Sequence, residues 1–161
     1  MKAWLSGWFG GGKPRIEIAK LRDAPRLAEL HSASFHRGWG EGEFESMIAE
    51  RNTLIQCLRL GRRTVGFAVS RIGADEAEIL SVAIDARHRG RGLSRDLLLT
   101  HLGHLSGRGV RRIFLEVEEN NAPARRLYER TGFTVVGRRE RYYRGAGGEQ
   151  LNALLMRRDL S

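Results

Sequence analysis

Glycine and arginine alternate in one short stretch that is suited to binding phosphate, Arg89-Gly90-Arg91-Gly92-Leu93-Ser94. An apolar, strand-like run (79–84) precedes it and a leucine-rich, helix-like run (97–105) follows it. Glycine lets the backbone take positive φ angles and approach an anion closely, and the start of a helix offers free N–H groups. The arginines, with Arg95 in the next turn, add forked cationic donors. We therefore interpret the stretch as a phosphate-binding turn, although a loop of solvated arginines would have the same composition.

The composition suits one domain that binds something anionic. The 161 residues carry a formal net charge of +9, and 41% of them are hydrophobic, which is enough for a proper core. Nucleic acid, a nucleotide cofactor or an acidic surface would each satisfy the charge. Cys57 is the only cysteine, and we expect it in the core rather than as a nucleophile. No apolar run approaches membrane-spanning length, so we expect a cytoplasmic protein without membrane contact.

The chain is expected to contain one domain and a short extension. Residues 1–14 include Gly10-Gly11-Gly12 after an apolar patch and are expected to form a flexible N-terminal extension. Residues 15–161 are expected to fold as a single domain. Within this domain His101 and His104 lie three residues apart, but no third ligand is suitably spaced, so no metal site is expected.

Alternating and helical hydrophobic patterns predict an α/β domain with a mixed sheet of about seven strands. The strands are expected at 16–18, 54–60, 64–72, 76–84, 112–117, 133–136 with 140–143, and 151–156. Helices are expected after Asp23, which we assign as an N-cap, around 44–48, at 97–105 and from Asn120-Asn121 onward. Short polar turns between 54 and 84 predict an antiparallel meander. The helical crossover after residue 84 predicts that 112–117 pairs parallel with 76–84.

Two further motifs connect the phosphate-binding turn to a known family. The chain has Leu-Glu-Val-Glu-Glu-Asn-Asn at 115–121 and Leu-Tyr-Glu-Arg-Thr-Gly-Phe at 127–133, followed by Arg141-Tyr142-Tyr143. With the frame Arg89-x-x-Gly92-x-Ser94, this pattern resembles the GNAT acetyltransferase superfamily over about residues 15–160. Within the superfamily it resembles the ribosomal-protein alanine N-acetyltransferase type. Ser94 departs from the superfamily's glycine-rich motif, and Glu118 and Asn152 depart from this type.

The resemblance implies acetyl-CoA as cosubstrate and a mostly antiparallel sheet with a splayed parallel pair in its middle and flanking helices. It places the pantetheine beside the fourth strand and the pyrophosphate on the glycine-rich turn. The residues that it assigns to acetyl-CoA are Val82, Ala83, Ile84, Arg89, Gly90, Arg91, Gly92, Leu93, Ser94, Arg95 and Asn121. From the residues alone, Asn121 is equally well explained as the N-cap of the next helix.

Acetyl transfer to an amine needs a group that takes the proton of the amine and a group that protonates the leaving thiolate. The resemblance assigns these roles to Glu116 and Tyr128, which would otherwise be a polar strand end and a core aromatic. It also implies that Trp39, Tyr142 and Tyr143 line the site of the acceptor. A tryptophan in a loop is as often packed against the core, so both roles stay open for Trp39.

The expected activity is acetyl transfer to a primary amine, foremost the N-terminal alanine, or a similar residue, of a ribosomal or other protein. A GNAT enzyme that acetylates a small-molecule amine is the alternative, because both would share one acetyl-CoA site. A third class is a non-enzymatic RNA- or ribosome-binding module. The net charge suggests this class, together with the arginines at 138, 139, 141, 144, 157 and 158.

Overall fold

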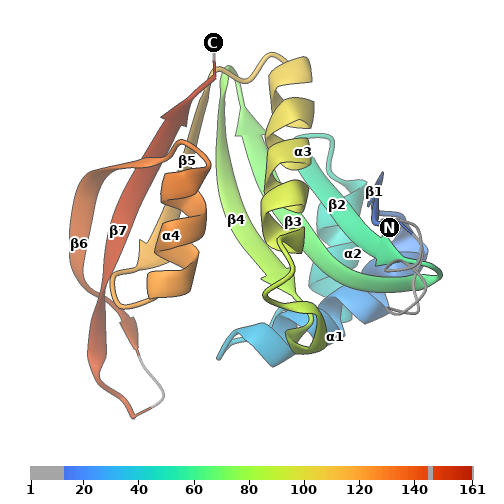
Figure 1. Ribbon diagram of the computed structural model, residues 1–161, viewed down its shortest axis with the longest axis horizontal. Helices are drawn as coiled ribbons and strands as arrows, with labels where there is room; N and C mark the ends of the chain where they lie inside the picture. The colour runs from blue at the N-terminus through green and yellow to red at the C-terminus, as the bar shows by residue number, and fades with distance from the viewer. Residues whose placement is uncertain (1–12, 145–146, 161) are drawn as a thin grey trace, which may run out of the picture.

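The computed structural model describes residues 13–144 and 147–160, except for the side chains of 141–144. These residues form a seven-stranded sheet with the strand order β1-β2-β3-β4-β5-β7-β6 (Figure 1). The strands are β1 (Arg15–Ile18), β2 (Thr53–Leu60), β3 (Arg63–Gly73), β4 (Glu76–Ile84), β5 (Arg112–Glu118), β6 (Thr134–Arg144) and β7 (Gln150–Asp159). The helices are α1 (Ala24–Ser34), α2 (Glu41–Ala49), α3 (Leu93–Gly107) and α4 (Ala122–Arg130), with 3-10 turns η1 (Leu21–Asp23) and η2 (Ala86–His88). Of the predicted flexible extension, residues 1–12 lie outside the described residues.

The strand pairing confirms the predicted topology. β2, β3 and β4 form an antiparallel meander joined by short turns, and β1 adds to β2 in the antiparallel sense. β5 pairs parallel with β4, because α3 carries the chain across one face of the sheet between them. β7 then pairs antiparallel with both β5 and β6. The described sheet is therefore mixed and mostly antiparallel, with one parallel pair in its middle.

Helices cover both faces of this sheet (Figure 1). On one face α3 and α4 bury a cluster that includes Leu98 of α3 and the strand residues Ile79 and Leu115. On the opposite face α1 and α2 bury a second cluster, in which the rings of Phe44 and Phe67 meet edge-on at 5.6 Å. The sheet is thus the middle layer of three, with apolar side chains on both of its faces. None of the described helices is long and apolar enough to span a membrane.

Two residues with chemically reactive side chains are part of the core. Cys57 is fully buried, as predicted, and burial raises the pKa of its thiol to about 12. His101 is also fully buried, and its ring nitrogens lie 2.7 Å from Ser70 Oγ and 2.8 Å from Gln56 Oε1. These contacts join α3 to β3 and β2, so His101 is structural. Within the described residues no three His, Cys, Asp or Glu side chains are grouped to hold a metal ion.

Asp23 differs from its predicted role. It occupies the N-cap position of α1, but its side chain makes no capping hydrogen bond there. Its carboxylate instead accepts from the backbone N–H of Lys20 at 2.8 Å and from the Arg59 guanidinium at 3.1 Å. A nearly buried carboxylate gains more from a cationic fork than from one neutral helix N–H, which explains the difference.

Candidate active site

The parallel strands β4 and β5 separate in the middle of the sheet. Their pairing runs only from Glu76 opposite Arg112 to Ile79 opposite Leu115, although β4 continues to Ile84 and β5 to Glu118. Beyond that point the two strands diverge, as Figure 1 shows. Among the described strands, the last residues of β4 therefore pair with β3 alone. This splayed pair leaves a strand edge that fits a ligand with amide groups, such as the pantetheine of acetyl-CoA.

A β-bulge lies where the strands separate. Ile79 is opposite Ser70 and Ser81 is opposite Val69, so Leu80 is an additional residue on β4. The bulge reverses which face later residues point to: Ala83 packs with the cluster under α1 and α2, whereas Val82 packs with those under α3. The sequence did not identify this bulge. The adjacent apolar pair Ile79-Leu80, which interrupts the alternation, was the available signal.

The glycine-rich turn leads from the end of β4 into α3. Gly90 and Gly92 both have positive φ, 78° and 76°, and Gly92 is the N-cap of α3. A Cβ at either position would meet no atom within 4 Å, so glycine is required for its backbone angle and not for space. The turn thus brings the N-terminus of α3 to the end of β4, which is the arrangement predicted for phosphate binding.

The charged residues of this turn have different surroundings. Arg89 points back, donating from Nε to the carbonyl of Ile84 at 3.0 Å and from Nη2 to Ser34 Oγ at 3.5 Å. Arg89 therefore braces the turn in this structure. Arg91 and Arg95 are exposed, whereas Ser94 is half-buried in the first turn of α3. Both exposed arginines are accessible to an anion at the helix N-terminus.

Asp85 fixes the turn to the rest of the domain. Its backbone N–H donates to the carbonyl of Val65 at 2.7 Å, and its carboxylate pairs with the Arg26 guanidinium at 3.0 Å. Arg26 also donates to the carbonyl of Thr64 at 3.0 Å. The backbone N–H of Arg87, which donates to Asp85 Oδ1 at 3.0 Å, and the Arg26 ion pair hold the pKa of the Asp85 carboxyl below its usual range. This anchor was not predicted, because its partners are distant along the chain.

Glu116 and Tyr128 lie on opposite faces of the sheet. Leu115 and Val117 share a buried cluster with Tyr128 on the face covered by α3 and α4. Because side chains alternate along a strand, Glu116 between them points to the face of α1 and α2. Glu116 is also the first residue of β5 beyond its last pair with β4. Glu116 thus stands where the strands separate, whereas Tyr128 belongs to the cluster on the other face.

The Glu116 carboxylate forms an ion pair with Arg139 of β6. Its Oε1 lies 3.2 Å from Arg139 Nη1, and only 15% of the Glu116 side chain is exposed, compared with 58% for Arg139. Arg139 crosses β7 to reach Glu116, since β7 lies between β5 and β6 in the sheet. Register irregularities between β6 and β7 made this contact unpredictable from the sequence.

Tyr128 and Asn121 are both carried by α4. Tyr128 is 9% exposed, and its ring meets that of Phe133 edge-on at 5.7 Å. Asn121 is the N-cap of α4, and its Oδ1 accepts from the backbone N–H of Ala124 at 3.2 Å. The capping role considered for Asn121 is therefore present, and the exposed position of Asn121 leaves it accessible to a ligand as well.

The predicted acceptor residues are described only in part. Trp39, in the loop between α1 and α2, is half-buried and stacks on His31 with 4.3 Å between ring centroids. The backbone N–H of Trp39 also donates to His31 Nδ1 at 2.9 Å. Trp39 thus packs on the core in this structure. Tyr142 and Tyr143 belong to β6 by their backbone, but their side chains lie outside the described part of the chain.

Comparison with known proteins identifies the class. Residues 24–133 match the acetyltransferase (GNAT) family, and this chain belongs to that family. It is an N-acetyltransferase whose acetyl donor is acetyl-CoA, which confirms the predicted family, enzyme class and cosubstrate. The interpretation as a non-enzymatic module is therefore not supported.

Individual relatives cover nearly the whole chain. An Escherichia coli protein, the [ribosomal protein bS18]-alanine N-acetyltransferase, is 32% identical over 141 residues, which are 88% of this chain and 94% of the relative. The N-alpha-acetyltransferase RimI of Mycobacterium tuberculosis is 37% identical over 143 residues, covering 85% and 87% of the two chains. The crystal structure of the ribosomal-protein-S18-alanine N-acetyltransferase from Escherichia coli superposes with a TM-score of 0.86 at 29% identity, covering 92% of this chain and 95% of the other.

Proposed function

We propose that this enzyme acetylates the α-amino group at the N-terminus of a protein, with Glu116 as general base and Tyr128 as general acid. One observation carries the proposal: Glu116 stands where β4 and β5 separate, and Tyr128 lies on the other face of the sheet. A base and an acid on opposite faces suit a reaction in which the amine and the thioester approach from opposite sides. The names of two relatives, an alanine N-acetyltransferase of a ribosomal protein and an N-alpha-acetyltransferase, support the acceptor.

Glu116 is suited to deprotonating the amine. An α-ammonium group has a pKa near 8, so much of the acceptor is protonated at neutral pH and cannot attack a thioester. The Glu116 carboxylate accepts this proton, directly or through a water molecule. Its ion pair with Arg139 orients the carboxylate along the sheet face before the acceptor arrives.

Tyr128 completes the proton balance on the other face. When bound, acetyl-CoA supplies the acetyl group as a thioester, so a C–N bond forms while a C–S bond breaks. Tyr128 donates its hydroxyl proton to the departing sulfur, while Glu116 holds the proton taken from the ammonium group. The second proton that the nitrogen loses as the amide forms restores the Tyr128 hydroxyl through solvent. Glu116 then releases its proton, so each transfer frees one proton. The strand β4 beyond Leu80 offers backbone N–H groups for the negative charge that develops on the carbonyl oxygen.

The cosubstrate would be held by backbone and helix-terminus interactions. The residues that suit this role are those predicted from the sequence, 82–84 on β4, 89–95 in the turn and Asn121 on α4. Two observations support the fit: β4 is paired on one side only beyond Ile79, and the space above Gly90 and Gly92 is open. The N-terminus of α3 and the exposed Arg91 and Arg95 then face the pyrophosphate.

The acceptor site is proposed to be lined by Trp39, Tyr142 and Tyr143. Residues 15–161 form the proposed catalytic domain. The acceptor is a ribosomal protein, which the name of the Escherichia coli relative supports, and the reaction takes place in the cytoplasm. A small-molecule amine would use the same acetyl-CoA site but would not depend on residues that follow the N-terminal one in a peptide.

Free-thiol release from acetyl-CoA tests the function. The enzyme is assayed with peptides that begin with Ala, Ser, Gly or Met and share the remaining sequence, beside a panel of small amines. Selective turnover of the Ala peptide is expected. The matched control is the same peptide with its N-terminus already acetylated, which should give no thiol even if it contains lysine. Turnover of small amines alone, or equal turnover of the blocked peptide, would contradict N-terminal acetylation.

A further inference from the structure

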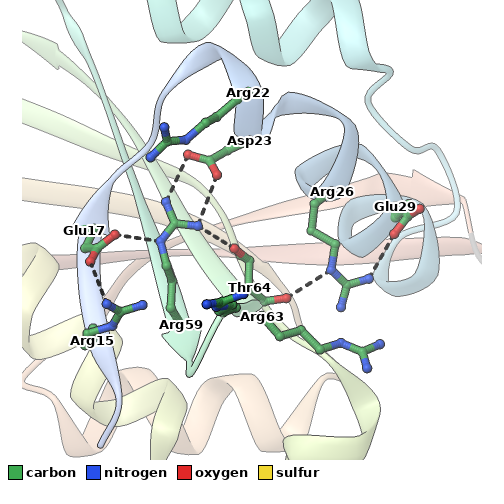
Figure 2. A pocket seen from close by; sticks show the side chains of 10 residues that line it. Arg15, Glu17, Arg22, Asp23, Arg26, Glu29, Arg59, Arg63 and Thr64 are labelled. Atoms are coloured by element: carbon green, nitrogen blue, oxygen red, sulfur yellow. Dashed lines mark hydrogen bonds and ion pairs between the residues drawn. The ribbon is translucent and has the colours of Figure 1, made fainter. Parts of the chain in front are cut away.

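A hollow of about 760 Å³ lies on the part of the domain formed by β1, η1, α1 and the β2–β3 hairpin. Figure 2 shows that arginine dominates its lining: six of the ten residues are arginine, and three are acidic. It contains none of the residues assigned above to acetyl transfer or acetyl-CoA binding. Its charges therefore need a separate explanation.

The three carboxylates of the hollow are paired with three of its arginines, Arg59, Arg26 and Arg15, the last lying 3.7 Å from Glu17. Arg59, whose side chain is only 11% exposed, donates to Asp23 at 3.1 Å and to Glu17 at 2.7 Å. Arg26 pairs with Glu29 at 3.0 Å and donates to the carbonyl of Thr64 (Figure 2), and its Nη2 also reaches Asp85. Pairing with Arg59 holds the pKa of Glu17 below its usual range. The negative charge of the hollow is thus neutralised within the protein.

Three other arginines are left without such partners. Arg22 of η1, Arg62 in the β2–β3 turn and Arg63 at the start of β3 are exposed. Within the described residues, none of their guanidinium groups forms an ion pair or hydrogen bond. They stand on the rim of one hollow but on two separate segments. Three solvent-facing cations at one site, in a chain with a net charge of +9, make this region suited to an anionic partner.

The arginines that the sequence suggested for nucleic-acid contact behave differently. Those on β6 and β7 whose side chains are described are bound to the protein itself. Arg138 pairs with Glu119 and Glu140, and Arg139 pairs with Glu116. Arg157 pairs with Asp159, and Arg158 donates to the carbonyl of Thr131. The arginines of these two strands whose side chains are described are thus neutralised or bound within the protein, unlike Arg22, Arg62 and Arg63 of the hollow.

We propose that Arg22, Arg62 and Arg63 bind the phosphodiester backbone of a nucleic acid, at a site separate from the acetyl-CoA turn. Guanidinium groups recognise phosphate oxygens through paired hydrogen bonds. Three exposed cations on two segments suit successive phosphates of a chain better than one isolated ion, because no buried cradle of donors surrounds a single position. No aromatic side chain lines the hollow to stack on a base, so the binding is independent of base sequence.

Fluorescence anisotropy with a labelled single-stranded RNA of about 20 nucleotides tests the site at several salt concentrations. The full-length protein is compared with the triple variant Arg22→Ala/Arg62→Ala/Arg63→Ala. Three lost phosphate contacts should reduce the slope of log K against log salt by about 2 and weaken binding at least about tenfold at low salt. Unchanged affinity and slope in the triple variant would overturn the proposal.

A second triple variant controls for net charge. Arg51, Arg71 and Arg108 are also exposed and form no ion pair within the described residues, and they lie outside the hollow. Arg51→Ala/Arg71→Ala/Arg108→Ala should keep nearly the wild-type slope, and an equal loss in this variant would overturn a localised site. Equally strong competition by ATP, at the same phosphate concentration as the RNA, would instead assign the site to a free nucleotide. Binding is measured without acetyl-CoA, so it is independent of the proposed acetyl transfer.

Discussion

The Glu116 carboxylate lies 3.2 Å from the Arg139 guanidinium, on the face of the sheet opposite Tyr128. The carboxylate is largely buried while its cationic partner is mostly exposed, so the interaction is asymmetric. An ion pair with one exposed partner contributes about 1 kcal/mol or less. Removing the Glu116 carboxylate and removing the Arg139 guanidinium should therefore change the activity by different amounts.

Glu116→Gln is expected to lower kcat by about a hundredfold or more, because the amide keeps the size of the side chain but cannot accept the proton of the amine. Acetyl-CoA binding should persist, and isothermal titration of the variant measures this directly. Arg139→Met is the matched control: loss of a weak orienting pair should reduce kcat by no more than about fivefold. Equal losses in the two variants, or loss of acetyl-CoA binding in Glu116→Gln, would contradict a role as base.

Tyr128→Phe is expected to lower kcat by about tenfold to a hundredfold. The loss should be smaller than for Glu116→Gln, because a thiolate can leave without being fully protonated, whereas a protonated amine cannot attack. The edge-on contact with Phe133 survives the substitution, so the aromatic packing of α4 should be retained. Thiol release and thermal unfolding of the same preparation test both statements. A large fall in Tm would show that the hydroxyl is structural.

Gly92→Ala should raise the KM for acetyl-CoA by about tenfold, because an L side chain at φ 76° costs roughly 1–2 kcal/mol and forces the turn to shift. Gly103→Ala is the control from the same helix. A Cβ there meets no atom within 4 Å and the backbone is helical, so stability should rise by about 0.5–1 kcal/mol with KM unchanged. If Gly92→Ala bound acetyl-CoA normally, the turn would not depend on its left-handed glycine.

Stability should fall as the pH drops from about 6.5 towards 4. Burial lowers the pKa of His31 to about 4 and that of His101 to about 3, so both are neutral in the folded protein. The unfolded chain binds their protons below about pH 6.5, and stability falls by up to about 1.4 kcal/mol per pH unit for each histidine. Urea unfolding at pH 6.5 and pH 5 measures the slope.

The variant His31→Asn removes one of the two histidines that titrate on unfolding. The Asn amide oxygen can accept the Trp39 N–H in place of His31 Nδ1, and it does not titrate. The variant will lose stacking with Trp39, so its absolute stability should be lower. Its loss of stability between pH 6.5 and pH 5 should nevertheless be about half that of the wild type. A slope identical to that of the wild type would show that His31 does not contribute.

The predictable parts of the fold were those encoded by local periodicity. The short turns at Gly61 and Ala74-Asp75 determined the meander, and the crossover by α3 determined the parallel pair. The N-cap role of Asn121 was also visible, because it depends on residues three positions apart. Family resemblance supplied the enzyme class and cosubstrate, which the residues alone left open.

The unpredicted features all depend on partners that are distant in the chain. The Arg59 guanidinium takes Asp23 away from its capping role across 36 residues, and Arg26 reaches Asp85 across 59. The bulge at Leu80 is set by the register with β3, which no local pattern specifies. For the same reason the arginines of β6 and β7 were interpreted as unpaired positive charge, because their side-chain partners could not be inferred from the sequence.

The separation of Glu116 and Tyr128 by the thickness of a sheet has a kinetic consequence in the proposed reaction. An amine that arrives at one face and a thioester that lies along the other occupy different entrances, so both can be bound at once. Initial-rate plots for the two substrates should then intersect rather than run parallel. In this arrangement neither product blocks the exit of the other. The acetylated protein can therefore be released while CoA remains bound, even if that protein is still part of a larger assembly.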